Sequence, residues 1–120
     1  MGDRRNVIIK AESENFGIAL YTHWTGSEIL PEIALGLERG KSRWDDAGYF
    51  TRIMFDQITR HEGKDETTGF GIYPLTSDGQ SPMEPFPGYD PVIDLDDGSV
   101  ELDGKSYPFN KFICTFLPDD

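Results

Sequence analysis

The sequence is poor in the residues that most catalytic and metal sites use. Its 120 residues include one cysteine and two histidines. Cys114 has no partner for an internal disulfide and lies in an apolar run at 112–117, so we expect a buried hydrophobic residue in a reducing compartment. Two histidines and one cysteine cannot form a structural zinc site without carboxylate ligands. We therefore expect no bound metal and no cofactor.

Enzyme motifs are missing as well. The chain contains no Gly-x-Ser-x-Gly, P-loop or dinucleotide fingerprint. Residues 94–98 look like the start of a calcium loop, but glycine stands at the fifth position and Lys105 where the closing glutamate belongs, so a hairpin turn is expected there. An enzyme that uses His23 as general base stays an alternative without motif support.

Long hydrophobic runs are absent from the sequence. Apolar stretches reach only five or six residues, whereas a membrane-spanning helix needs about 20. The first five residues lead directly into a strand-like run and do not form a signal peptide. We expect a soluble, cytoplasmic protein without membrane contact.

Basic residues are scarce relative to acidic ones. The chain has 11 lysines and arginines against 22 aspartates and glutamates, for a net charge of -11. Such a chain repels nucleic acid and anionic membranes at long range, so direct binding to a duplex is not expected. A basic protein surface is the better partner, including a nucleic-acid groove that the chain occupies as a phosphate mimic. The alternative is that the charge serves solubility alone.

The helical elements follow from apolar spacing. The length fits a single domain over residues 1–120. Ser27 offers an N-cap for a first helix that Gly40 ends. Asp45 or Asp46 caps a second helix, in which apolar residues recur at intervals of three and four until about His61.

The remaining segments predict strands and one long loop. Runs at 6–10 and 16–21 predict a β-hairpin, and 70–75 a short strand that ends at proline. A second hairpin is expected from 92–95 and 100–102 around an Asp-Gly turn, then a last strand over 110–117. Residues 76–91 are rich in proline and predict an irregular loop. The order β-β-α-α-β-β-β-β predicts an α+β fold with an antiparallel or mixed sheet and both helices on one face.

Aromatic and basic residues gather at the two ends of the first predicted helix. Along the strand that precedes it, Tyr21 and His23 share one face and Trp24 takes the other. One interpretation is a pocket in which an indole stacks on a planar ligand and imidazole supplies a hydrogen bond. The other places Trp24 in the core. The residues expected in such a pocket are Arg4, Tyr21, His23, Trp24, Arg43 and Trp44.

The segment before the second helix has two interpretations. Arg43 could clamp an anion near the free N–H groups of the helix, with Trp44 beside it. Asp45 and Asp46 oppose this, because they occupy the same N-terminus and repel a phosphate. In the second interpretation an aspartate caps the helix and Trp44 belongs to the core.

Several segments form a recognisable set: Gly2-Asp3-Arg4-x-Asn6, Tyr21-Thr22-His23-Trp24-x-Gly26, Leu30-Pro31 and Arg43-Trp44-Asp45-Asp46-x-x-Tyr49-x-x-Arg52-Ile53. This set resembles a small family of uncharacterised proteins carried by bacteriophages and by bacterial chromosomes, including prophage regions. The resemblance covers about residues 2–58 and carries over no catalytic or ligand residue. By genomic context it implies a counter-defence factor that antagonises bacterial immunity.

Two mechanisms compete within that expectation. In the first, acidic residues engage a basic groove of an immune effector; the expected residues are Glu62, Asp65, Glu66, Asp94, Asp96, Asp97, Glu101 and Asp103. In the second, the aromatic and arginine residues bind a nucleotide immune signal, commonly at a subunit interface, so a homo-oligomer is expected. A structural accessory protein of phage or host is a further alternative.

Overall fold

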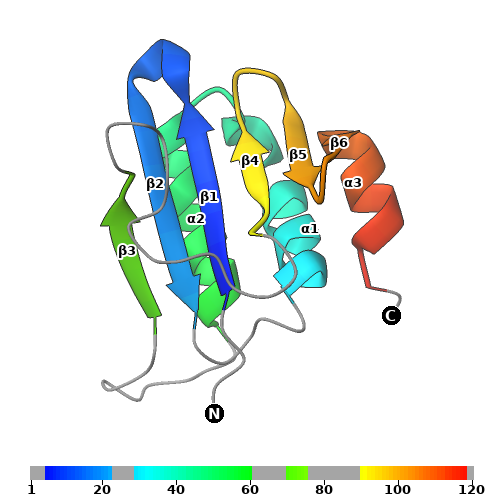
Figure 1. Ribbon diagram of the computed structural model, residues 1–120. Coiled ribbons are helices and arrows are strands. Elements are labelled where there is room, and N and C mark those ends of the chain that lie inside the picture. The colour runs from blue at the N-terminus through cyan, green and yellow to red at the C-terminus, as the bar shows by residue number, and fades with distance from the viewer. Residues whose placement is uncertain (1–4, 23–28, 61–69, 76–89, 119–120) are drawn as a thin grey trace.

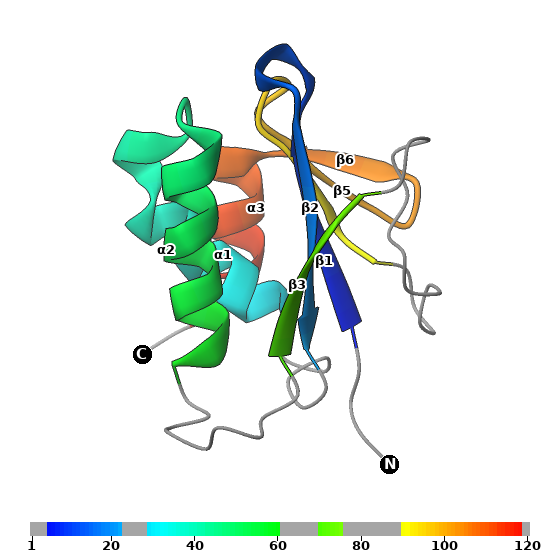
Figure 2. The same cartoon turned by 90° about the vertical axis from the view of Figure 1, so that its left-hand side faces the viewer.

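The computed structural model describes residues 5–22, 29–60, 70–75 and 90–118. They form a six-stranded mixed sheet in the order β3-β2-β1-β4-β5-β6, with three helices on one face of the sheet (Figures 1 and 2). The predicted α+β class with a mixed sheet is confirmed. The elements in chain order are β1 Arg5–Ala11, β2 Phe16–Thr22, α1 Ile29–Arg39, α2 Ala47–Thr59, β3 Phe70–Pro74, β4 Val92–Asp94, β5 Ser99–Leu102, β6 Lys105–Pro108 and α3 Phe109–Phe116, with short 3-10 turns η1 Glu12–Glu14 and η3 Lys41–Arg43.

The sheet is mixed because its central strand β1 has two kinds of neighbour. β1 pairs antiparallel with β2 in the first predicted hairpin and parallel with β4. Val7 pairs with Leu20, and both are buried on the helix-covered face. The next pair, Asn6 and Tyr21, takes the opposite face because side chains alternate along a strand. The second predicted hairpin is confirmed as β4 and β5, and β3 ends at the predicted proline.

The helix boundaries follow the predicted capping residues where the structure describes them. Asp46 Oδ1 accepts a hydrogen bond from Tyr49 N at 3.2 Å, so this aspartate caps α2. α1 ends at Arg39, directly before Gly40. A Cβ atom at Gly40 would lie 2.9 Å from the Phe50 ring, so the close packing there requires glycine. The predicted cap Ser27 and residues 76–89 of the predicted loop at 76–91 lie outside the described residues.

The C-terminal segment corrects the predicted element order. Residues 110–117 were expected to form a strand, but the structure has helix α3 there, preceded by the unpredicted strand β6. Phe109, Phe112, Ile113 and Phe116 recur at helical spacing, and the first three are buried. Cys114 points away from this apolar face and is exposed, so the expectation of a buried thiol is wrong.

The core lies between the sheet and the helices. β1, β2, β4 and β5 contribute aliphatic side chains from one side, and the three helices contribute theirs from the other. Ile9, Ile33, Phe50, Ile93 and Phe112 are fully buried in this layer. Within the described ranges, no helix is both long enough and apolar enough to span a membrane.

Candidate protein-binding surface

Two acidic turns meet at one end of the sheet. The carboxylate of Asp96, in the β4–β5 turn, accepts hydrogen bonds from Ser13 N at 2.8 Å and from Ser13 Oγ at 2.6 Å. Ser13 belongs to the turn between β1 and β2, so two segments 83 residues apart become one surface. We call this surface the acidic end; its carboxylates are Glu12, Glu14, Asp94, Asp96, Asp97 and Glu101.

The hydrogen bonds from Ser13 also affect the charge of Asp96. The side-chain hydrogen bond lowers the pKa of Asp96 below its ordinary value, and the backbone hydrogen bond lowers it further. Both bonds favour the ionised form because an ionised carboxylate is the better acceptor. Asp96 therefore carries its negative charge throughout the neutral range.

The β4–β5 turn is held by its own side chains. Asp94 Oδ1 accepts from Asp97 N at 3.1 Å, and Asp97 Oδ2 accepts from Ser99 Oγ at 2.7 Å. Gly98 has φ 68°, a conformation that glycine adopts without strain. The predicted Asp-Gly turn is thus present. Among the described residues, no group of three or more histidine, cysteine or acidic side chains is arranged to hold a metal ion.

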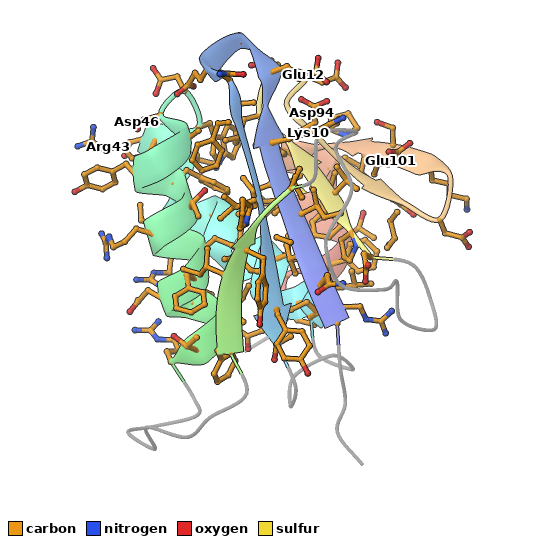
Figure 3. The ribbon with its side chains drawn as sticks, turned by 60° about the vertical axis from the view of Figure 1, so that its left-hand side comes forward. Lys10, Glu12, Arg43, Asp46, Asp94 and Glu101 are labelled. Carbon is orange, nitrogen blue, oxygen red and sulfur yellow. The ribbon has the colours of Figure 1, made fainter. Side chains whose placement is uncertain are left out.

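Lys10 lies within the acidic end. Its ammonium group is 4.0 Å from Asp94 Oδ2, and the two residues pair in the β1–β4 register. In Figure 3, Glu12 and Asp94 lie beside Lys10 and Glu101 lies farther along on β5, whereas Arg43 and Asp46 lie on the helix layer. One lysine leaves most of the six carboxylates without an ion-pair partner in the described part of the chain. The acidic end therefore presents a strongly negative surface.

The predicted protein-binding residues are only partly brought together. Asp94, Asp96, Asp97 and Glu101 belong to the acidic end. Asp103 lies in the turn after β5, at the other end of that strand. The other three predicted residues lie outside the described ranges: Glu62, Asp65 and Glu66.

Two acidic residues of this surface escaped the sequence-based prediction. Glu12 and Glu14 lie between the two runs of the first predicted hairpin and were not among the predicted binding residues. No local pattern relates that turn to residue 96, because their contact depends on the parallel pairing of β1 with β4. The polar, acidic run at 12–15 was the signal that the sequence offered.

The predicted ligand residue Trp44 packs within the protein. Its indole Nε1 donates a hydrogen bond to the carbonyl oxygen of Leu37 at 3.1 Å. Its ring centroid lies 4.8 Å from that of Phe109 in α3. Both the polar atom and a ring face are therefore engaged, which favours the interpretation that Trp44 belongs to the core and joins α1 to α3.

Arg43 and Tyr21 lie on different sides of the sheet. The Arg43 guanidinium carbon is 4.1 Å from the centroid of the Tyr49 ring, on the outer side of α2. Tyr21 lies on the sheet face opposite the helices, and its ring centroid is 6.5 Å from that of Tyr73. The described members of the predicted pocket therefore do not share one cavity. The other three members, Arg4, His23 and Trp24, lie outside the described residues.

A chain of polar contacts links α1 to α2, with its buried part at Glu32 and Gln57. Gln57 Nε2 donates to Glu32 Oε1 at 2.7 Å, and Gln57 Oε1 accepts from Arg39 Nη1 at 2.9 Å. Arg39 Nη2 continues to Asp56 Oδ2 at 2.9 Å, and this hydrogen bond lowers the pKa of Asp56. The amide of Gln57 uses both of its ends, so the chain braces the helices and offers no unpaired base for chemistry.

Comparison with known proteins does not extend these observations. No protein-family model, curated protein or solved structure matched the chain.

Proposed function

We propose that this chain is a non-enzymatic binding protein of phage or prophage origin that antagonises bacterial immunity. In this proposal the acidic end occupies a basic surface of an immune effector in the cytoplasm of the host cell. The observation that carries the proposal is the pair of hydrogen bonds from Ser13 to Asp96, which holds two acidic turns together. The phage origin itself rests on the sequence resemblance.

A fixed arrangement of carboxylates favours such a partner for physical reasons. Complementary charge accelerates the encounter and selects against acidic surfaces, which include nucleic acids. Carboxylates held by the fold lose little conformational entropy when they bind guanidinium or ammonium groups. The interaction should weaken as salt increases, because the acidic end is exposed to solvent.

The alternative mechanism, nucleotide sequestration, has less support among the described residues. Trp44 is engaged by Leu37 and Phe109, and Tyr21 lies on the far side of the sheet from Arg43. The expectation of a homo-oligomer depended on that mechanism. His23, on which the enzyme alternative depends, lies outside the described residues.

The test uses charge reversal with a matched control. The double variant Glu12→Lys with Glu101→Lys changes the acidic end but leaves the hydrogen bonds of Asp96 and Asp97 intact. The control variant, Glu38→Lys with Asp45→Lys, makes the same change in net charge on exposed residues near the helices. Both are expressed in bacteria that carry individual defence systems, and phage plating efficiency is measured.

The wild-type chain should raise phage plating on at least one defended host. We expect the Glu12/Glu101 variant to lose most of this effect and the control to keep it. Tagged protein recovered from infected cells should then retain an effector subunit, and added salt should release it. A retained nucleotide, or equal loss in both variants, would contradict the proposal.

A further inference from the structure

β3 is an edge strand of the sheet that the structure describes, and its outer side presents backbone hydrogen-bonding groups. Leu75 N donates to Gly17 O at 3.2 Å, which continues the antiparallel ladder between β2 and β3. Hydrogen-bonded pairs alternate along such a ladder, so the next ones are Tyr73 with Ala19 and Gly71 with Tyr21. The N–H and C=O groups of Phe70 and Ile72 consequently point away from β2, toward the edge of the sheet.

The side chains of β3 do little to protect this edge. Phe70–Pro74 contains no charged residue, although charge is a common protection of edge strands. Ile72 is 54% exposed, more than any other large hydrophobic residue that the structure describes. Pro74 occupies an outward position, where its missing N–H costs no ladder bond. It therefore blocks only the end of the edge.

The opposite edge strand, β6, is better protected. Phe109 N donates to Gly98 O at 2.9 Å, and the same alternation leaves only Ser106 and Pro108 with outward backbone groups. Proline has no N–H, so Ser106 provides the single outward donor of β6. Lys105 adds a charge, and α3 follows the strand directly. Within the described residues, no strand pairs with the outer side of β3, and it is the less protected of the two edges.

The free edge leads to the acidic end. β3 runs toward the turn between β1 and β2 (Figure 1). Near its end Pro74 pairs with Ile18, and Leu75 N donates to Gly17 O. Gly17 lies three residues after Glu14 of that turn. A strand added antiparallel to β3 would begin beside this turn. An extended chain advances about 3.3 Å per residue, so side chains two or three positions before that strand would come close to Glu12 and Glu14.

We infer that the partner of the acidic end supplies an extended basic segment, which pairs with β3 as an additional antiparallel strand. The backbone of this segment forms hydrogen bonds with Ile72, and one of its apolar side chains covers the exposed part of Ile72. The basic residues that precede the paired part of the segment face the acidic end. This inference rests on the proposed function. A second copy of the chain is a poorer occupant, because two chains of charge -11 repel each other.

The test probe is a capped synthetic peptide, Arg-Lys-Arg-Thr-Val-Thr-Val-Thr. Its matched control has both valines replaced by proline, which keeps every charge but removes two backbone donors. Binding is measured by calorimetry, and the site is located by NMR on isotope-labelled protein. We expect the valine peptide to bind about tenfold more tightly than the proline peptide and to shift the Ile72 amide signal.

Two protein variants separate backbone pairing from side-chain contact. Ile72→Pro removes the outward N–H without removing a bond to β2, whereas Ile72→Thr keeps the N–H and the β-branched shape. The preference for the valine peptide should disappear in Ile72→Pro and persist in Ile72→Thr. If Ile72→Pro does not fold, the comparison of the two peptides on the wild-type protein still tests whether backbone pairing contributes to binding.

The outcomes distinguish this inference from the proposed function. Equal binding of both peptides, abolished by the Glu12/Glu101 variant, would overturn strand addition and leave the acidic end as the binding surface. No binding of either peptide would also overturn strand addition. The proposed function is tested separately, by the plating assay. A dimer in sedimentation experiments that Ile72→Pro dissociates would assign the edge to a second copy instead.

Discussion

Asn6 donates two hydrogen bonds to Asp90, from its backbone N to Oδ1 and from its side-chain Nδ2 to Oδ2, each at 3.2 Å. The side chain of Asn6 is fully buried at the beginning of β1, and Asp90 lies two residues before β4. This contact therefore fixes the start of the only parallel strand pair in the described sheet.

Replacement of Asp90 by alanine should destabilise the fold. The change leaves two donors of a buried residue without this acceptor, at a cost of about 1–3 kcal/mol. Urea denaturation followed by circular dichroism measures the free energy of unfolding. Glu101→Ala, on an exposed position of β5, serves as the control and should change it by less than about 0.5 kcal/mol. Equal effects would show that Asp90 does not hold the strand pair.

Ser13→Ala should raise the pKa of Asp96 toward its ordinary value. The variant removes the side-chain hydrogen bond, which is the largest cause of the lowered pKa. The pKa of Asp96 is lower in the folded protein than in the unfolded chain. The stabilisation that ionised Asp96 gives the fold is therefore complete above the unfolded pKa and is lost as pH falls through the folded pKa. NMR titration of the Asp96 carboxyl carbon measures the shift. An unchanged titration would mean that Ser13 does not hold the acidic turn in solution.

The two contacts of Trp44 predict graded losses of stability. Trp44→Phe keeps a ring against Phe109 but removes the hydrogen bond to Leu37, which should cost about 1 kcal/mol. Trp44→Ala removes both and should cost about 3–5 kcal/mol. If Trp44 serves the core, Trp44→Phe should keep full activity in the plating assay. Loss of that activity at unchanged stability would indicate that Trp44 contacts a ligand.

Cys114 should react with a thiol reagent in the native protein. Its side chain is exposed on α3, so labelling by a maleimide needs no unfolding. Mass spectrometry at several times, with and without denaturant, measures the labelling rate. A rate that increases by orders of magnitude in denaturant would restore the sequence-based expectation of a buried thiol. Cys114→Ser provides the unlabelled control.

The segment around Cys114 shows why one element was assigned wrongly from the sequence. Phenylalanines favour strands by composition, but Phe109, Phe112 and Phe116 recur at intervals of three and four. The spacing outweighs the composition, because in a helix all three rings reach the same side of the core. The two predicted helices, which the structure has at 29–39 and 47–59, by contrast had both apolar spacing and a glycine stop or an aspartate cap.

The candidate surface was harder to predict than the fold. Alternation along β2 correctly separates Tyr21 from Leu20 and Thr22, because it depends only on local geometry. The contact between Ser13 and Asp96 depends on which strand lies beside β1, and local patterns do not determine that order. The brace from Glu32 through Gln57 to Arg39 is likewise visible only after two helices have packed.

The parallel pairing of β1 with β4 also determines when the acidic end can exist during synthesis. Ser13 and Asp96 are 83 residues apart, and contacts of such separation form slowly because a long loop must close first. A nascent chain in which β4 and β5 have not yet joined the sheet lacks the contact between Ser13 and Asp96, and with it the complete acidic end. Under the proposed function, a partner of the acidic end would bind only after β4 has paired with β1, and separation of these two strands would release it.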